Sequence, residues 1–214
     1  SARQPYLRAN TTISNLNYNT FDQVLPYAEE RGLDTVHFEY AGEFWDELLD
    51  RSVLDNIRPN PYFVRQDGKS ILLNEEQARV VKAKVAQMKE DVRSMEIQLQ
   101  TENIDTLTIG QMVSGLCDNR RCYIIRDKIT VDPQGNIVGC PFYGNWVLGN
   151  IREQRLEDIW NNEKHRAFKK HFQKRFSNGR MSICDHCILG VQRNSTVAQN
   201  IREHFNWIRG RGRV

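Results

Sequence analysis

The sequence predicts an α/β fold in its first half and a small cysteine-containing unit of mixed helix and strand in its second half. Three observations lead to this prediction. Two short stretches rich in β-branched residues flank a helical stretch near the start, a long amphipathic helix follows them, and all five cysteines fall after residue 116. The 214 residues are enough for one large domain or two small ones with a buried core.

Charge separates the same two halves. Residues 1–116 hold 12 basic and 18 acidic residues, whereas residues 117–214 hold 18 basic and 9 acidic residues. The apolar fraction of 39% and the charged fraction of 27% exclude collagen-like and wholly disordered chains. No run of about 18 apolar residues occurs and the first residues lack an apolar signal segment, so we expect a cytoplasmic protein with no membrane partner.

The first elements form a predicted βαβ unit. Residues 10–14 predict a strand, Asn19 and Gly32 mark the predicted start and end of a helix, and residues 35–40 predict a second strand. Pro26 lies inside that predicted helix, where proline destabilises helical structure, and the sequence pattern does not explain its presence. A strand, a helix and a strand in this order favour parallel pairing of the two strands.

A long helix follows a mostly irregular region that includes a short predicted helix near residues 45–54. Asn74 is its predicted N-cap and Gln77 completes a capping box. Its apolar stripe consists of Ala78, Val81, Val85, Met88, Val92 and Met95. A third strand is predicted at residues 97–100 and a short helix at residues 107–116. Two or three parallel strands rarely form a sheet alone, so we expect the first half to be part of a larger α/β sheet or barrel.

The cysteines have the spacing Cys117-x4-Cys122-x17-Cys140-x43-Cys184-x2-Cys187. Between Cys122 and Cys140 we predict a β-hairpin, with strands at residues 123–126 and 136–138 and a turn at residues 132–135. A hairpin brings its ends together, and the Cys-x2-Cys motif supplies a second close pair of thiols. Two such pairs predict a four-thiolate site for zinc or for an iron–sulfur cluster.

Other interpretations of the cysteines stay open from the residues alone. Zinc ribbons usually bind the metal through two Cys-x2–4-Cys pairs. Here 17 residues separate Cys122 from Cys140, so an iron–sulfur cluster is favoured over zinc. The Cys-x2-Cys motif alone could be a redox pair, although no βαβ unit introduces it. Cys117 is interpreted as a free structural thiol, with a role as a replacement ligand for Cys122 as the alternative.

The pattern of residues 122–187 resembles the SPASM and twitch extensions of radical SAM enzymes. Cys122-x12-Gly135-x4-Cys140 is similar to the signature that opens these extensions, and Cys184-x2-Cys187 is similar to the pair that closes it. The residues at 129–141, 148–151 and 156–161 also resemble the family. A full SPASM domain continues with three further cysteines, and this chain has none after Cys187. The resemblance therefore implies the shorter twitch form.

The resemblance carries expectations about fold and cofactors. It implies that residues 1–116 are the last βα units of a partial (β/α)6 radical SAM barrel. It further implies that residues 117–192 are a twitch domain and that residues 193–214 are a C-terminal helix and basic tail. One auxiliary [4Fe–4S] cluster is expected on the four ligands Cys122, Cys140, Cys184 and Cys187.

The resemblance also carries expectations about activity. The family's Cys-x3-Cys-x2-Cys loop, which holds a second [4Fe–4S] cluster and S-adenosylmethionine, is absent from this sequence. We expect the loop upstream of Ser1 in a longer chain, and this chain to be inactive alone. The auxiliary cluster is implied to transfer an electron or to position the substrate.

The expected partners are a small-molecule or peptide substrate and an electron donor such as a flavodoxin or ferredoxin; nucleic acid is not expected. The alternative function is a four-cysteine zinc module that binds nucleic acid or a protein. In this alternative, the basic residues of the second half, including the arginines at the C-terminus, would form the binding surface.

Several polar residues follow the predicted strands. Asn15 lies just past the first strand, and Glu39, Tyr40 and Glu43 lie at or just past the end of the second. In an α/β barrel this edge is the active-site side, so Asn15 and Glu39 are candidates for cofactor binding. No residue is assigned a catalytic role.

Three histidines in the second half are predicted to face solvent. His186 lies inside the Cys-x2-Cys motif and is predicted as a solvent-facing turn residue, with a place beside the metal ligands as the alternative. His165 and His171 lie in the basic stretch at residues 164–180, which is predicted as a solvated helix.

Overall fold

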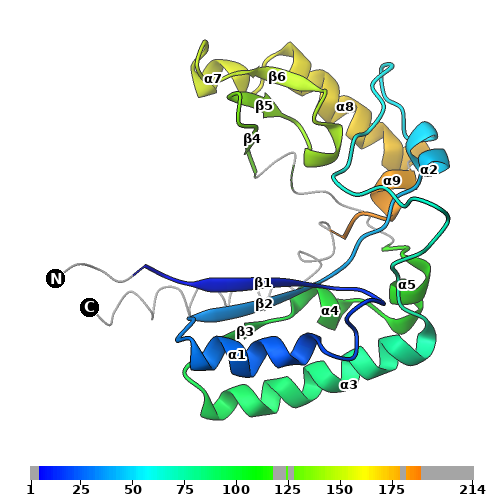
Figure 1. Ribbon diagram of the computed structural model, residues 1–214. Coiled ribbons are helices and arrows are strands. Elements are labelled where there is room, and N and C mark those ends of the chain that lie inside the picture. The colour runs from blue at the N-terminus through cyan, green and yellow to red at the C-terminus, as the bar shows by residue number, and fades with distance from the viewer. Residues whose placement is uncertain (1–4, 118–123, 125–127, 179–181, 189–214) are drawn as a thin grey trace.

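The computed structural model shown in Figure 1 describes residues 5–117, 124, 128–178 and 182–188. The described elements of the first half are β1 (Arg8–Ile13), η1 (Phe21–Gln23), α1 (Val24–Glu30), β2 (Thr35–Tyr40), α2 (Asp46–Asp50), α3 (Glu75–Asp91), η2 (Val92–Ser94), β3 (Gln98–Gln100), α4 (Glu102–Thr106) and α5 (Ile109–Ser114). Those of the second half are β4 (Thr130–Val131), β5 (Asn136–Val138), η3 (Pro141–Tyr143), β6 (Val147–Asn150), α7 (Leu156–Ile159), α8 (Glu163–Asn178) and α9 (Ser182–Asp185).

The first half is built on a parallel sheet, as predicted. Its strand order is β1-β2-β3, and both neighbouring pairs are parallel. Helices α1 and α3 lie on the same side of this sheet (Figure 1). The described strands form an open three-stranded sheet, and no barrel is seen among the described residues, so the prediction that these strands are the last βα units of a partial barrel is supported only as far as the parallel sheet.

Local sequence accounts for the two helices that cover the sheet. The side chain of Asn74 accepts a hydrogen bond from the backbone N–H of Gln77, and the Gln77 side chain accepts one from the Asn74 backbone, which confirms the predicted capping box of α3. Helix α1 begins at Val24, not at Asn19. Pro26 therefore lies in the first turn of α1. A backbone N–H at this position would have no acceptor within the helix, so proline does not destabilise the helix here.

The core of the first half lies between the sheet and these helices. Val36, Phe38 and Tyr40 alternate along β2 and face the helices, and each is at most 2% exposed. The ring of Phe21 meets that of Phe38 edge to face at 5.2 Å. The predicted stripe of α3 is buried at its first four positions, which are Ala78, Val81, Val85 and Met88.

The opposite face of the sheet is polar. Side chains alternate along strands, so the residues between the core-facing positions point to the other side. They are Arg8, Asn10, Thr12, Thr35, His37, Glu39, Gln98 and Gln100. Parallel sheets are usually apolar on both faces, and this one offers hydrogen-bonding groups on the side away from the helices.

The second half has its own antiparallel sheet and apolar cluster. The strand order is β4-β5-β6, and α8 lies beside this sheet (Figure 1). Phe168 of α8 is fully buried and packs against the ring of Trp146 at 5.0 Å. A Cβ at Gly139 would lie 2.6 Å from the Phe168 ring, so this close packing requires glycine at position 139.

The predicted hairpin is confirmed at its turn and its second strand, but its first strand was misplaced. The strand that pairs with β5 is β4, not residues 123–126. Within that predicted strand, Ile124 is helical and its carbonyl accepts a hydrogen bond from Lys128 N–H at 3.1 Å, and the other three residues lie outside the described residues. Ile124 is 7% exposed, and its helical backbone departs from the preference of a β-branched residue for a strand.

Both long helices, α3 and α8, carry many charged side chains. Across the described stretches, none of the helices has the length and apolar composition that a membrane span requires.

Candidate metal centre and the neighbouring strand edge

Three of the four predicted ligands lie in the described residues, and Cys122 lies outside them. Cys140 directly precedes η3 and is 6% exposed, and Cys184 lies in α9 and is 8% exposed. Both belong to the same apolar cluster. Cys187 is half-buried, and its backbone N–H donates to the Cys184 carbonyl at 3.3 Å.

The donor chemistry of these residues fits an iron–sulfur cluster. Buried thiols in apolar surroundings are the ligands that such clusters use, and the aromatic side chains around them limit access of water. Within the described stretches, no three His, Cys, Asp or Glu side chains gather closely enough to hold a metal ion. The four-ligand set depends on Cys122 and stays a prediction.

The turn between β4 and β5 is organised by Asp132. Its carboxylate accepts hydrogen bonds from the backbone N–H groups of Gln134 and Asn136 and from the Asn136 side chain, at 2.8 to 2.9 Å. These bonds, led by that of the Asn136 side chain, lower the pKa of Asp132 from its ordinary value. Gly135 has φ +88°, which favours glycine. The signature glycine is thus explained by turn geometry.

Ser52 fixes the helix that carries Cys184. Its Oγ accepts a hydrogen bond from the backbone N–H of Ile183 at 3.0 Å and donates to the carbonyl of Leu48 at 2.7 Å. Its carbonyl accepts from the Tyr143 hydroxyl at 2.7 Å. Ser52 is fully buried, and the sequence offered no signal for this role.

Cys117 lies next to the Cys-x2-Cys motif. Its backbone N–H donates to the carbonyl of Asp185 at 2.6 Å, and its buried free thiol lies 3.8 Å from the Gly115 carbonyl oxygen. Burial raises the pKa of the Cys117 thiol to about 12, and the nearby Cys187 thiolate adds to the effect. Cys117 is a free thiol, as predicted, and the structure shows that it is buried next to the Cys-x2-Cys motif.

The prediction that His186 faces solvent is wrong. The residue is 9% exposed, and its ring meets that of Trp45 edge to face at 4.9 Å. Burial lowers the pKa of the imidazole, and the nearby Gly115 carbonyl opposes the shift. A long-range contact with Trp45 decides this burial, so local sequence could not reveal it.

His165 is also buried, contrary to the prediction of a solvated helix. It is 1% exposed, its ring packs on Trp160 at 4.3 Å, and its Nδ1 accepts from the Asn161 backbone N–H at 3.0 Å. Lys164, Arg166 and Lys170 are exposed, so residues 163–170 of α8 have one solvated side and one buried side. The side chain of His171 lies outside the described residues.

The polar residues at the ends of the strands hold one segment of chain in place. The buried Glu43 carboxylate accepts hydrogen bonds from Ser70 Oγ at 2.8 Å and from Ile71 N–H at 3.1 Å. Asn15 donates from Nδ2 to the Ser70 carbonyl at 2.7 Å. The Tyr40 hydroxyl accepts from Leu73 N–H at 2.9 Å, and burial raises the pKa of this phenol. These contacts give Tyr40 and Glu43 structural roles.

Asn15 and Glu39 remain candidates for cofactor binding. The Asn15 Oδ1 atom is buried and has no hydrogen-bond partner among the described residues. Glu39 lies on the polar face of the sheet with its side chain 38% exposed, 3.6 Å from His37 Nδ1. Asn15 thus keeps an acceptor atom that a ligand could use, and the assignment of both residues to cofactor binding stays a prediction.

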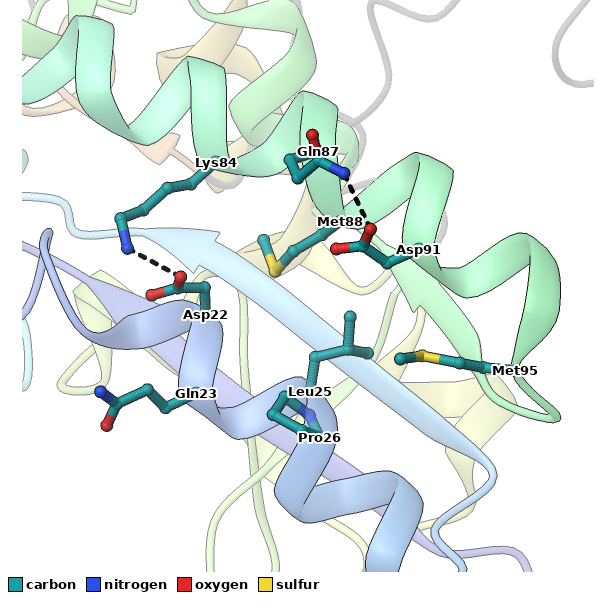
Figure 2. Close-up of a pocket in the computed structure, with 9 residues that line it drawn as sticks. All are labelled: Asp22, Gln23, Leu25, Pro26, Lys84, Gln87, Met88, Asp91 and Met95. Carbon is teal, nitrogen blue, oxygen red and sulfur yellow. Dashed lines mark hydrogen bonds and ion pairs between the residues drawn. The ribbon is translucent and has the colours of Figure 1, made fainter.

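A cavity of about 350 Å³ lies elsewhere, between α1 and α3 (Figure 2). Lys84 donates to Asp22 Oδ2 at 2.7 Å across it, and Gln87 donates to Asp91 at 2.8 Å. None of the predicted site residues lines this cavity. It lies on the helical side of the sheet and away from the polar face.

Comparison with known proteins identifies part of the chain. A family model described as SPASM, an iron–sulfur cluster-binding domain, matches residues 122–188. An S-adenosyl-L-methionine-dependent 2-deoxy-scyllo-inosamine dehydrogenase from Niallia circulans is 34% identical over 92 residues. The match covers 42% of this chain and 34% of that relative, so the chain aligns with about a third of the relative's length.

Proposed function

Because the chain carries a SPASM iron–sulfur cluster-binding domain and is a distant homologue of a radical SAM dehydrogenase, we propose that it is the auxiliary-cluster part of a radical SAM enzyme. The cluster is one [4Fe–4S] group of the twitch kind. Its ligands are Cys122, Cys140, Cys184 and Cys187. Such a cluster supplies one-electron transfer when bound.

The observation that supports this proposal most is the position of the Cys-x2-Cys motif. Asp185 within the motif accepts the backbone N–H of Cys117, and His186 packs on Trp45, which follows β2 by five residues. The candidate centre therefore lies against segments that extend from the carboxyl edge of the parallel sheet. In α/β folds that edge holds substrates and cofactors, so a cluster here can exchange an electron with a bound substrate or position it.

The polar face of the sheet fits a small polar substrate and the polar parts of S-adenosylmethionine. We assign Asn15 and Glu39 to cofactor binding in the complete enzyme, because their acceptor oxygens lie at the ends of β1 and β2. The relative's printed name gives an amino-bearing cyclic substrate and a dehydrogenase reaction. By analogy we propose an oxidation of a small polar molecule, with a flavodoxin or ferredoxin as the electron carrier.

Metal analysis of anaerobically purified protein tests this proposal. We expect brown protein with broad absorption in the visible blue and about four irons and four sulfides per chain. Cys→Ala at any of the four ligands should abolish the colour. Cys117→Ala is the matched control, because it removes a neighbouring buried thiol, and it should keep the colour. One tightly bound zinc and no iron would instead support the four-cysteine zinc module.

A further inference from the structure

Two arginines lie on the segment that joins α2 to α3, and their side chains have different partners. The Arg58 guanidinium donates hydrogen bonds to the carboxylates of Asp46 and Asp50, although its side chain is 43% exposed. The Arg65 side chain is only 29% exposed, yet its guanidinium makes no hydrogen bond to any of the described residues. Donors that are largely removed from water rarely lack acceptors, so the Arg65 side chain needs an explanation.

Neighbouring groups hold Arg65 in position. Its backbone N–H donates to the Phe44 carbonyl at 2.6 Å. Its guanidinium carbon lies over the Trp45 ring, 5.2 Å from the ring centroid, which is a favourable cation–π distance. Neither contact provides a hydrogen-bond acceptor for the N–H groups of the side chain.

Glu43 balances the charge of Arg65 without satisfying its donors. Arg65 Nη1 lies 3.9 Å from Glu43 Oε2, which makes an ion pair but is too long for a hydrogen bond. The two Glu43 oxygens accept hydrogen bonds from Ser70 Oγ at 2.8 Å and from Ile71 N–H at 3.1 Å instead. The pair therefore carries no net charge, and the donors of Arg65 stay available to one further acceptor.

Arg65 lies at the carboxyl edge of the parallel sheet. Glu43 follows β2 by three residues, and Ser70, which donates to Glu43, accepts from the side chain of Asn15 beyond the end of β1. The Trp45 ring contacts the Cys-x2-Cys motif on the other side. Direct contacts thus join Arg65 to the strand ends, which is the edge where α/β folds bind substrates.

We propose that Arg65 binds a carboxylate group of the substrate, which makes the substrate a small carboxylic acid. As an assignment of substrate class, this inference rests on the proposed function. A guanidinium presents a fork of N–H groups that matches the two oxygens of a carboxylate. Phosphate also matches this fork, but the neighbouring Glu43 carboxylate repels a dianion more strongly than a monoanion. The Arg65–Glu43 pair therefore favours a carboxylate over a phosphate.

Saturation-transfer-difference NMR of the wild-type protein, with lactate as the probe and at constant ionic strength, tests the inference. Lactamide is the matched neutral control, because it has nearly the same shape but no negative charge. We expect a saturable signal for lactate and about tenfold weaker binding of lactamide, since hydrogen bonds between charged groups are the stronger ones. Inorganic phosphate should displace lactate less effectively than acetate does.

Substitutions of the two arginines show whether the lactate signal depends on Arg65. Arg65→Gln removes the charge and the fork, and it should weaken lactate binding by about tenfold. Arg58→Gln is the matched control, because Asp46 and Asp50 already occupy Arg58, and it should leave lactate binding unchanged. Arg65→Lys keeps a positive charge beside the buried Glu43 and should bind lactate with intermediate strength, since lysine lacks the fork.

Three results would overturn the inference. The first is equal binding of lactate and lactamide by the wild-type protein, which needs no variant. The second is equal loss of lactate binding in Arg58→Gln and Arg65→Gln. The third is displacement of lactate by S-adenosylmethionine but not by its decarboxylated form, which would assign Arg65 to the carboxylate of that cofactor and not to the substrate.

Failure of the proposed function gives a different result, because the titration is made on protein whose iron and sulfide content is measured. Protein that holds the cluster but binds lactate and lactamide equally rejects the role of Arg65 and leaves the proposed function standing. Protein that holds no iron but binds lactate through Arg65 keeps the carboxylate site. In that case the proposed function fails, and with it the assignment of this carboxylate to the enzyme's substrate.

Discussion

The two halves of the molecule are stabilised in different ways. The first half buries regular faces of α1, α3 and β2 against one another. The second half has strands of two to four residues, and side-chain hydrogen bonds from Asp132 and Ser52 hold its turns and its short α9. Short strands alone give little stability, so we expect the second half to depend more on single contacts and on the proposed cluster.

The largest expected difference between the halves follows removal of the cluster. Ligands that lie far apart along the chain are linked through the metal, so its loss should weaken the structure around them. We expect chelation of iron under anaerobic conditions to increase amide hydrogen exchange in β5, β6 and α9. Exchange in β2 and α3 should remain unchanged. Cys117→Ala should behave as wild type. A uniform increase of amide hydrogen exchange across both halves would contradict the view that only the second half depends on the cluster.

Two matched core truncations should each destabilise one half. Phe38 and Phe168 are both fully buried, and Phe→Ala in such a core costs about 3–5 kcal/mol. We expect Phe38→Ala to increase exchange mainly in the parallel sheet and Phe168→Ala mainly in β5, β6 and η3. Denaturant unfolding followed with hydrogen exchange measures both effects. Equal loss of protection in both halves for either variant would show that they unfold as one unit.

Loss of the Ser52 hydroxyl should have a smaller effect on the second half. Ser52→Ala leaves the buried N–H of Ile183 without its acceptor, and an unsatisfied buried donor costs about 1–3 kcal/mol. The matched control is Ser94→Ala, since Ser94 Oγ donates to a backbone carbonyl at the surface. We expect Ser94→Ala to change stability by less than about 0.5 kcal/mol. Similar unfolding midpoints for the two variants would contradict the assigned role of Ser52.

Local patterns predicted the first half well. The bounds of β2, the capping box of Asn74 and the core stripe of α3 all follow from residue spacing and short-range hydrogen bonds. Asn19 was wrong as a cap because η1 occupies the turn before α1, and the same shift explains Pro26. Other errors here are displacements of element ends, except that helix α4 was not predicted at all.

The sequence predicted less of the second half because long-range contacts decide its structure. The turn at Asp132 is a local motif and was predicted, whereas the burial of His186 comes from its contact with the distant residue Trp45. Ser52 lies 131 positions from its partner Ile183, and such a pair leaves no periodic signal. The family pattern of cysteines identified the domain, but it carries no information about which neighbouring side chains are buried.

The smallest expected effect concerns the pH dependence of the hairpin turn. The pKa of Asp132 lies below its ordinary value of 3.8, because hydrogen bonds from Asn136 favour the carboxylate in the folded turn. The carboxylate therefore contributes stability at pH values above that ordinary pKa, and the contribution is lost as the pH falls through the lowered pKa. The Asp132 side chain is partly exposed, so solvent screens part of this contribution.

Asp132→Asn tests this dependence because its amide oxygen can still accept from Gln134 and Asn136 without titrating. At pH 7 we expect faster exchange of these two amides in the variant than in wild type. At an acidic pH below the lowered pKa of Asp132 the difference should shrink, since the wild-type carboxylate is then protonated. The two proteins are compared at the same pH. The pH dependence of the intrinsic amide exchange rate and any release of the cluster by acid then affect both proteins equally. A difference that stays constant between the two pH values would show that neutral hydrogen bonds, and not the charge, hold the turn that leads to Cys140.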